Sequence, residues 1–239
     1  MLNPAFYAPI FERKSIRKFA ETQLSAEQLK LVKAEMEAAT PLLPNENFKL
    51  ELNPSKEGWR IFGYCENTPL GNVNLGYVLQ QLDLALHLAG LGRLWYGFGR
   101  APRDVKPPKG LSYAMCLKIG ISAEPLTRNL SEFDRRASIV QGDNKALAEL
   151  LEPTRLAPSA MNSQPWMFSG DTGTIHVWRK QLGIKKLFLS RINLIDVGIS
   201  LCHAVLAVAH AGKAFSVEVQ APADTMDGYD YLLTLRLHS

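Results

Sequence analysis

Two stretches of the chain, residues 74–90 and 196–212, are apolar at most positions rather than along one face. A helix that is apolar around most of its circumference is buried inside a structure, whereas a surface helix keeps a polar face. Each stretch ends at a glycine, Gly90 or Gly212, and glycine commonly ends a helix because it adopts the left-handed conformation without strain. The pattern therefore predicts two buried central helices.

The two stretches also resemble each other. At an offset of 122 residues they share six identical pairs: Gly76/Gly198, Leu79/Leu201, Leu84/Leu206, Ala85/Ala207, Ala89/Ala211 and Gly90/Gly212. The tripeptide 13–15 (Arg-Lys-Ser) matches the tripeptide 136–138 (Arg-Ala-Ser) at an offset of 123. Self-similarity at a fixed spacing is typical of a duplicated structural unit, so the sequence predicts an internal duplication.

Other elements flank the central helices in the same order in both halves. Residues 25–39 and 144–156 have an amphipathic helical pattern, in which Ser25 and Gln28 form a predicted capping box and Asn144 or Asp143 is the second N-cap. Strand-rich stretches follow each central helix: residues 114–120 in the first half, and 215–219 and 231–237 in the second. We therefore expect an α+β fold with mixed or antiparallel sheet, in which each half runs helix, strand-like segment, buried helix, strand.

Pro125 marks the predicted boundary, which gives a first half of residues 1–125 and a second of 126–239. Apart from each other, the two halves would expose much apolar surface, so we expect them to pack as one pseudo-symmetric unit. Such a pseudo-dimer is expected to be a monomer in solution.

The composition narrows the class of protein. The 239 residues include 27 Lys and Arg against 23 Asp and Glu, a net charge of +4, which is too balanced for a nucleic-acid-binding surface. The three cysteines have no zinc-type spacing, so we expect a reducing compartment and no metal site. The N-terminus lacks the charge order of a secretory signal, and Ser200, His203 and His210 interrupt the apolar run, so we expect a cytoplasmic protein that spans no membrane.

Three segments that differ between the halves carry candidate chemistry. Residues 13–18 contain four cations and a serine, a set able to bind one phosphate group, although a solvated basic turn is the alternative. Residues 156–168 place small and amide side chains between Pro158 and Pro165, which suits a planar polar ligand or an ordinary polar loop. Residues 90–102 combine glycines with aromatic side chains, which suits close approach to a ligand or a packed strand.

In these segments the chain resembles the flavin-dependent nitroreductase family. Residues 13–19 (RKSIRKF) are similar to the family's RRSxRxF motif, and residues 156–166 (LAPSAMNSQPW) to its APSxxNxQPW motif. Residues 90–98 resemble the family's GLG…W…GF run. Members of the family are usually homodimers that hold two flavin mononucleotides (FMN) between subunits. Because the motifs here fall in two halves of one chain, the resemblance implies a fused pseudo-dimer with one FMN per chain and one inactive pseudo-site.

The resemblance also implies roles for individual residues. The expected phosphate-binding residues are Arg13, Lys14, Ser15 and Arg17, with Arg128 as a later cation. The residues expected to meet the ribityl chain and ring are Pro158, Ser159, Ala160, Asn162 and Gln164. Tyr96 and Gly97 are expected near the reactive edge of the flavin. The second clamp, at 135–138, and the first-half loop, at 41–44, lack the matching residues.

By this resemblance the protein is an oxidoreductase in which NAD(P)H reduces FMN, and FMN reduces a small nitroaromatic, quinone or similar electron-poor acceptor. The flavin supplies the redox chemistry, and the sequence identifies no catalytic acid or base. His87, His203 and His210 fall in the central helices, where hydrogen bonding within the core is expected. A flavin-binding protein without turnover, another flavin reaction on the same fold, and a scaffold without flavin are the alternatives.

Overall fold

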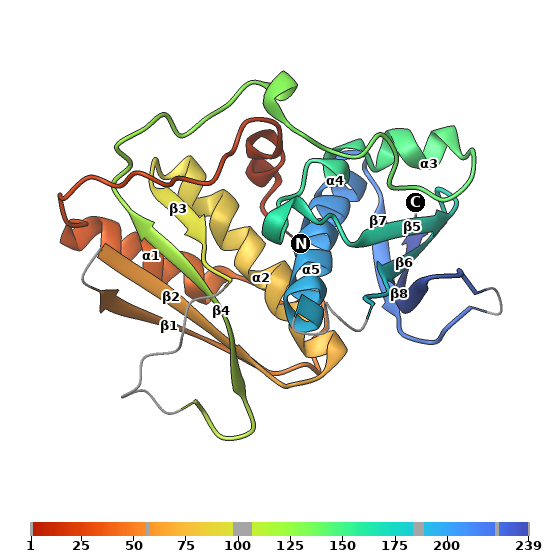
Figure 1. Ribbon diagram of the computed structural model, residues 1–239, viewed down its shortest axis with the longest axis horizontal. Coiled ribbons are helices and arrows are strands. Elements are labelled where there is room, and N and C mark those ends of the chain that lie inside the picture. Colours follow the sequence, from red (N-terminus) through yellow and green to blue (C-terminus); the bar gives the residue numbers. More distant parts are fainter. Residues whose placement is uncertain (1, 56–57, 98–106, 184–188, 223–224, 239) are drawn as a thin grey trace.

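Two long helices lie against each other in the middle of the molecule, with a β-sheet on either side (Figure 1). The computed structural model describes residues 2–55, 58–97, 107–183, 189–222 and 225–238. The helices are α2 (Pro69–Leu88) and α5 (Ser190–His210), and both are buried along most of their length. By length and composition α5 could cross a membrane, but 94% of its most apolar window is buried inside the fold. The prediction of two central core helices is confirmed.

A pair of glycines at equivalent positions in the predicted repeat allows α2 and α5 to approach each other closely. A Cβ atom on Gly198 would lie 1.9 Å from the carbonyl oxygen of Val73, and one on Gly76 would lie 2.1 Å from that of Ile195. Any larger residue at either position would therefore push the helices apart. The Gly76/Gly198 identity found in the sequence reflects this crossing.

The two sheets have the same strand order and are antiparallel throughout. The first has the order β1-β2-β4-β3, with β1 (Phe48–Ser55), β2 (Gly58–Cys65), β3 (Gly92–Trp95) and β4 (Ser112–Gly120). The second has the order β5-β6-β8-β7, with β5 (Trp166–Gly170), β6 (Thr174–Lys180), β7 (Ala214–Glu218) and β8 (Tyr229–His238). Each sheet joins a hairpin that precedes its central helix to two strands that follow it.

The fold is α+β, as predicted, and the matched sheets agree with the predicted duplication, whereas the boundary at residue 125 remains a prediction. Even the irregularities correspond, because the pairing register shifts between Gly63 and Tyr64 in one sheet and between Val177 and Trp178 in the other. The sequence predicted one strand-like segment before each central helix, and the structure has two strands there.

The shorter helices follow their predicted caps. Helix α1 (Ala26–Ala38) begins after Ser25, whose hydroxyl accepts a hydrogen bond from Gln28 N–H while the Gln28 side chain accepts one from Ser25 N–H. The predicted helix at 144–156 is two helices, α3 (Lys145–Leu150) and α4 (Glu152–Arg155). The break lies just before Pro153, which cannot donate a backbone hydrogen bond.

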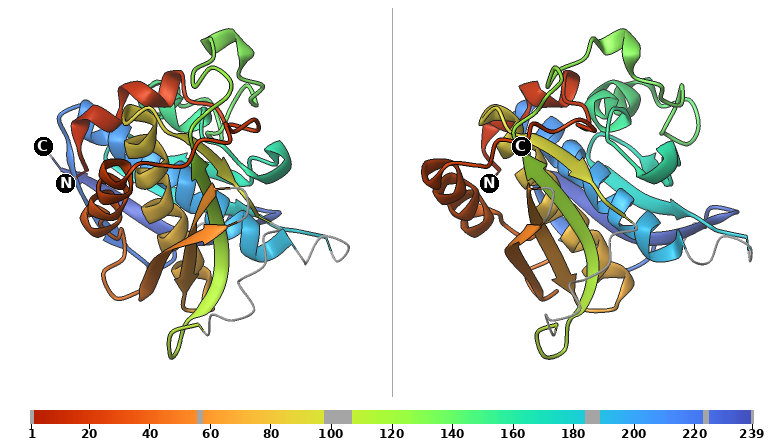
Figure 2. Two further views of the ribbon diagram at one scale, coloured as in Figure 1. Left: turned by 90° about the vertical axis from the view of Figure 1, so that its left-hand side faces the viewer. Right: turned by 60° about the vertical axis from the view of Figure 1, so that its left-hand side comes forward.

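Four 3-10 turns complete the described secondary structure: η1 (Pro4–Phe6), η2 (Ala8–Phe11), η3 (Leu130–Glu132) and η4 (Ala160–Asn162). After η2, residues 12–19, here called the basic segment, run antiparallel to the start of residues 121–139, here called the connector (Figures 1 and 2). Bridges join Arg13 to Thr127 and Phe19 to Ser122, and Arg128 N–H donates to the carbonyl of Glu12 over 2.8 Å. This pairing brings the beginning of the chain to the junction between its halves.

Candidate functional site

A cavity of 510 Å³, here called the basic cavity, lies where three segments meet: the basic segment, the connector, and residues 156–165, here called the proline loop. The residues that line it are Arg13, Lys14, Ser15, Arg17, Glu124, Arg128, Glu132, Asp134, Arg135, Pro158, Ser159, Met161 and Asn162. The size is within the range of small-molecule sites. Segments more than 140 residues apart in sequence thus form one cavity, as the two resembling motifs required.

The carboxylates of the basic cavity are already engaged by neighbouring groups. Glu124 accepts backbone hydrogen bonds from Arg17 and Lys18 and pairs with the Lys14 ammonium at 3.6 Å. A second carboxylate, Glu132, accepts from Asn129 N–H, and the third, Asp134, accepts from the Asn162 side-chain amide at 3.2 Å. Among the described residues, none of these carboxylates forms an ion pair with an arginine of the cavity, so its arginines retain capacity for an anion.

Three guanidinium groups, those of Arg13, Arg128 and Arg135, repel one another across this cavity. Burial, followed by the charges of Arg128 and Arg13, lowers the pKa of Arg135 to about 10. Burial, followed by the charge of Arg13, lowers the pKa of Arg128 to about 10 as well. In addition, the buried Nε atoms of Arg128 and Arg135 have no hydrogen-bond partner among the described residues. A bound phosphate would relieve the repulsion and satisfy these donors, so this set of side chains fits a phosphate group.

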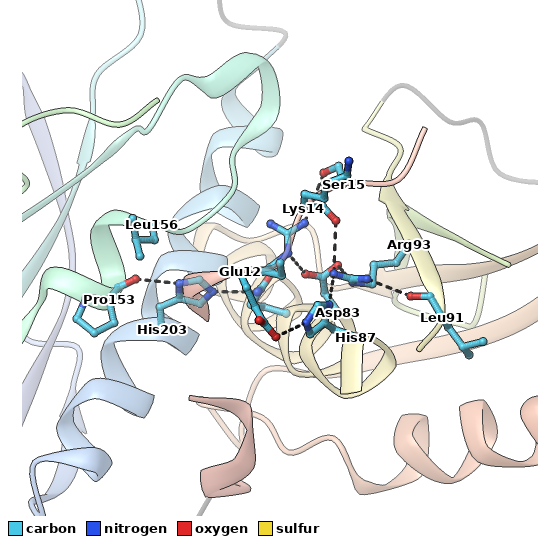
Figure 3. A network of polar contacts seen from close by, with 12 residues as sticks. Glu12, Lys14, Ser15, Asp83, His87, Leu91, Arg93, Pro153, Leu156 and His203 are labelled. Carbon is cyan, nitrogen blue, oxygen red and sulfur yellow. Dashed lines mark hydrogen bonds and ion pairs between the residues drawn. The ribbon is translucent and has the colours of Figure 1, made fainter. Parts of the chain in front are cut away.

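Arg13, which lines the basic cavity, belongs to a buried ionic network centred on Asp83 of α2 (Figure 3). Asp83 is fully buried and pairs with Arg13 Nε at 2.7 Å and with Arg93 Nε at 3.4 Å. Arg93 also donates to the carbonyls of Leu91, at 3.0 Å, and Lys14, at 3.4 Å. The basic segment is therefore fixed to the central helix through both its side chain and its backbone.

Two histidines extend this network without reaching the cavity. His87 Nδ1 lies 2.8 Å from Arg93, and its Nε2 lies 3.0 Å from Glu12; burial is the largest cause of its lowered pKa. Burial also lowers the pKa of His203 to about 3, and this neutral ring joins the helices through Gln80 at 2.9 Å and the Pro153 carbonyl at 3.1 Å (Figure 3). The third helical histidine, His210, stacks on Tyr7. The expectation of hydrogen bonding within the core is confirmed for His87 and His203, whereas His210 is exposed at the end of α5.

A second cavity of 210 Å³, the inner cavity, adjoins the basic cavity and shares five of its lining residues: Ser15, Arg17, Pro158, Ser159 and Met161. The rest of its lining is Leu94, Trp95, Gly97, Met115, Ala160, Asp196 and Ile199. The indole N–H of Trp95 is buried and has no hydrogen-bond partner among the described residues. Flat and apolar side chains with one spare donor fit an aromatic ring that carries polar edges.

The proline loop is held in a conformation that ordinary residues rarely adopt. Met161, Asn162 and Gln164 have φ angles of 52°, 55° and 45°, in the left-handed region. Its backbone is tied down from outside, because Ala160 N–H donates to both oxygens of Asp196, at 3.1 and 3.2 Å. Ser159 Oγ accepts from Gln164 N–H at 2.9 Å. Strained backbone of this kind gathers at functional sites.

Most of the sequence-predicted site residues line the two joined cavities, and two do not. Arg13, Lys14, Ser15, Arg17, Arg128, Pro158, Ser159, Ala160, Asn162 and Gly97 line one or both. Gln164 is buried, with its amide bonded to Arg136 N–H and the Asn162 carbonyl, and Tyr96 is 44% exposed beside Arg60. Neither is among the lining residues. Phe98 and Gly99, from the predicted glycine and aromatic segment, lie outside the described residues.

Sequence reasoning missed two residues of the site. Arg135 was assigned to the inactive second clamp, but it lines the basic cavity and donates to Asn162 Oδ1 at 3.0 Å. The signal for it was weak, because only the pairing of the connector with the basic segment brings Arg135 near Arg13. Asp196 was counted as part of an apolar helix, yet it is a buried carboxyl group in the wall of the inner cavity. Among the described residues, no group of three or more His, Cys, Asp and Glu is placed to hold a metal ion.

Comparison with known proteins gives a consistent family. Residues 5–208 match the model of a family described as "Putative TM nitroreductase". A crystal structure of a "putative nitroreductase" from Thermotoga maritima superposes with a TM-score of 0.69 at 22% identity, covering 97% of this chain and 93% of that one. No curated protein matches the sequence.

Smaller nitroreductases match about half of the chain. One from Desulfitobacterium hafniense with bound FMN has a TM-score of 0.46 at 15% identity, covering 58% of this chain and 100% of that one. Another, from Desulfovibrio desulfuricans and in complex with FMN, has a TM-score of 0.43 at 19% identity, covering 55% and 95%.

Proposed function

Because the chain belongs to the putative TM nitroreductase family, we propose that it is an FMN-dependent oxidoreductase that uses NAD(P)H to reduce a nitroaromatic, quinone or similar electron-poor acceptor. The observation that supports this most strongly is the pair of joined cavities, one lined by mutually repelling arginines and the other by flat apolar side chains. A phosphate and an aromatic ring in one molecule match this arrangement.

In this proposal the basic cavity holds the phosphate. Arg13, Arg128 and Arg135 supply charge and N–H donors, and Ser15 adds a hydroxyl. Asp83 keeps the Arg13 side chain in the lining of the cavity, because it is ion-paired with the Arg13 Nε. Lys14 contributes less, since Glu124 already neutralises much of its charge.

The inner cavity is proposed to hold the ring. Trp95, Met115 and Ile199 provide apolar contact, and the buried Trp95 N–H, which has no hydrogen-bond partner among the described residues, is proposed to donate to a polar atom of the ring. Gly97 lines the same cavity, and a Cβ atom there would make ordinary van der Waals contacts with Ile192 and Met115 at 3.7–4.0 Å. When bound, FMN would accept electrons as a hydride from NAD(P)H and pass them to the acceptor; the residues named here bind it and exclude water.

One FMN per chain is proposed, since the motifs complement each other across the halves only once. In the equivalent place of the first half, Leu42 and Leu43 are buried, and Asn74 Oδ1 accepts hydrogen bonds from both of their N–H groups at 2.9 and 3.0 Å. The absence of a second flavin there stays a prediction, as does a monomeric protein.

The test begins with purified wild-type protein, saturated with FMN and freed of excess ligand. We expect one FMN per chain by absorbance and phosphate content, and bleaching of the flavin spectrum by NADH or NADPH under anaerobic conditions. Adding a quinone should restore the oxidised spectrum. Protein that retains no FMN at saturating concentrations contradicts the proposal, and protein that retains FMN but is reduced by neither nucleotide is a flavin-binding protein without this turnover.

A further inference from the structure

The inner cavity contains one acidic side chain that the proposed binding of FMN does not use. Asp196 lies on α5, is 2% exposed and lines this cavity together with Trp95 and Gly97. Its only hydrogen bonds among the described residues come from Ala160 N–H, at 3.1 and 3.2 Å, and from the Ser163 hydroxyl, at 3.5 Å. No cation forms an ion pair with it in the described part of the chain.

The equivalent residue in the other half shows what a purely structural group looks like here. Asn74, at the offset of 122, accepts from Leu42 and Leu43 N–H and donates to the carbonyls of Leu43 and Glu46. An amide thus holds the loop through four hydrogen bonds in the first half, whereas the second half uses a carboxyl group that forms no ion pair within the described residues. A group that only had to hold the proline loop would not need a titratable proton.

We propose that Asp196 is the acid that protonates the electron acceptor when the acceptor lies against the ring held in the inner cavity, a role that rests on the function proposed above. Reducing a quinone to a hydroquinone takes two electrons and two protons. A hydride from the reduced cofactor brings the acceptor both electrons and one hydrogen nucleus. Asp196 supplies the second proton. The Asp196 O–H bond breaks, an O–H bond forms on the quinone oxygen, and water then reprotonates the carboxylate.

The surroundings keep Asp196 in the protonated form that this role needs. Burial raises the pKa of Asp196 to about 8, against the opposing effect of the hydrogen bonds from Ala160 and Ser163. Arg17 is the other ionisable residue among the described lining of this cavity, and it is exposed; Leu94, Trp95 and Met115 from β3 and β4 do not titrate. On the side of α5 that packs against α2, the residues nearest to Gly198 are Val73 and Tyr77. Burial raises the pKa of Tyr77 well above its ordinary value.

The experiment compares wild-type protein with Asp196→Asn, in which the amide oxygen can still accept from Ala160 N–H. Both are loaded with FMN, reduced chemically without NAD(P)H, and mixed anaerobically with a benzoquinone or with ferricyanide. General acids typically contribute ~100-fold or more, so reoxidation by the quinone should slow at least about that much in Asp196→Asn. Ferricyanide takes an electron without a proton, and its rate should stay within about twofold. Asp196→Glu, which retains an acid, should recover part of the quinone rate.

A second measurement needs no turnover. Infrared difference spectra of wild-type minus Asp196→Asn protein should show a protonated carboxyl band at pH 6 that disappears above pH 9. Equal quinone rates in the two proteins, equal slowing with quinone and ferricyanide, or an ionised Asp196 at pH 6 would each overturn the role of Asp196 while leaving FMN binding and NAD(P)H reduction intact. Wild-type protein that takes up no FMN would overturn both this inference and the function on which it rests.

Discussion

Replacing Arg128 by glutamine isolates the phosphate-binding role of the basic cavity. The Arg128 side chain stacks on the Phe133 ring at 3.5 Å, and its buried Nε has no hydrogen-bond partner in the described part of the structure. Glutamine keeps part of the aliphatic stem and removes the charge. Because the Arg128 side chain forms no hydrogen bond or ion pair among the described residues, we expect the fold of Arg128→Gln to be unchanged.

The expected loss follows from the charge and burial of this guanidinium. With a pKa of about 10, Arg128 remains protonated at pH 7 despite its burial and the nearby charge of Arg13. A hydrogen bond to a charged group contributes about 1.5–3 kcal/mol, and each 1.4 kcal/mol corresponds to roughly a tenfold change in Kd. Removing Arg128 also relieves its repulsion with Arg13 and Arg135, so we expect the lower part of this range, a Kd for FMN about 10- to 30-fold higher.

The assay is equilibrium titration monitored by quenching of flavin fluorescence, with FMN and with riboflavin, which lacks the phosphate. Arg128→Gln should weaken FMN binding and leave the Kd for riboflavin within about twofold of wild type. Arg236→Gln is the matched control, since it removes the same charge from β8, where Arg236 pairs with Glu218. If FMN binds both variants equally well, or if riboflavin and FMN lose the same affinity in Arg128→Gln, the assignment of the phosphate to this cavity is refuted.

Three further predictions concern the scaffold and its titrating groups. Gly198→Ala should prevent folding or lower the melting temperature by more than 10 °C, because its Cβ would lie 1.9 Å from the Val73 carbonyl oxygen. Gly183→Ala is the control, since the space around Gly183 is open, and it should melt at the wild-type temperature. Similar melting temperatures for the two variants would contradict the close helix crossing. Between about pH 4 and pH 8 the Asp196 carboxyl is ionised in the unfolded chain but protonated in the folded protein, so wild type loses roughly 1 kcal/mol of stability per pH unit as the pH rises. Asp196→Asn does not titrate and should gain stability relative to wild type by that amount. A difference in urea unfolding free energy that is constant across this range would contradict the raised pKa. Burial lowers the pKa of His203 to about 3 in the folded protein, so wild type should lose stability as the pH falls from about 6.5 toward 3 and the unfolded imidazole takes up a proton. In His203→Gln the melting temperature should therefore fall less steeply over this pH range. An unchanged dependence of melting temperature on pH would contradict a neutral buried ring.

Arg13, although the first residue of the recognisable motif, is a poor probe of ligand binding. It is 1% exposed and ion-paired with the fully buried Asp83, so Arg13→Ala leaves that carboxylate with Arg93 alone, at 3.4 Å. Breaking a buried pair in this way typically costs about 3–5 kcal/mol. Loss of FMN from Arg13→Ala would therefore not distinguish a lost contact from a damaged fold, which is why Arg128 is the better choice.

The sequence predicted those features of the fold that local patterns specify. The apolar circumference of residues 74–90 and 196–212, the glycines that end these stretches and the Ser25–Gln28 capping box each have a local physical cause, and each is confirmed. The break at Leu151 was missed because the helical periodicity continues through residues 144–156, although Pro153 was visible in the sequence. The hairpins β1–β2 and β5–β6 were merged into single segments because strand ends depend on pairing between strands.

The site was predictable where a residue belongs to a contiguous motif and unpredictable where only tertiary contacts bring it in. The basic segment and proline loop were found as motifs, and the structure places them around joined cavities. Arg135 reaches the same cavity because the connector pairs with the basic segment through the Arg13 and Thr127 bridge, a contact that no local pattern encodes. Asp196 was hidden because a single carboxyl group in an apolar helix has no distinguishing sequence signal, and its burial depends on the proline loop that covers it.

The most direct test of the central claim is a crystal structure of the wild-type protein with FMN. We predict one FMN per chain, with its phosphate within hydrogen-bond distance of Arg128 and Arg135 and its ring system against Trp95 and Asp196. Flavin bound in any other place, or two flavins related by the pseudo-symmetry of the halves, would contradict the claim that the basic segment and the proline loop of one chain close around a single ligand.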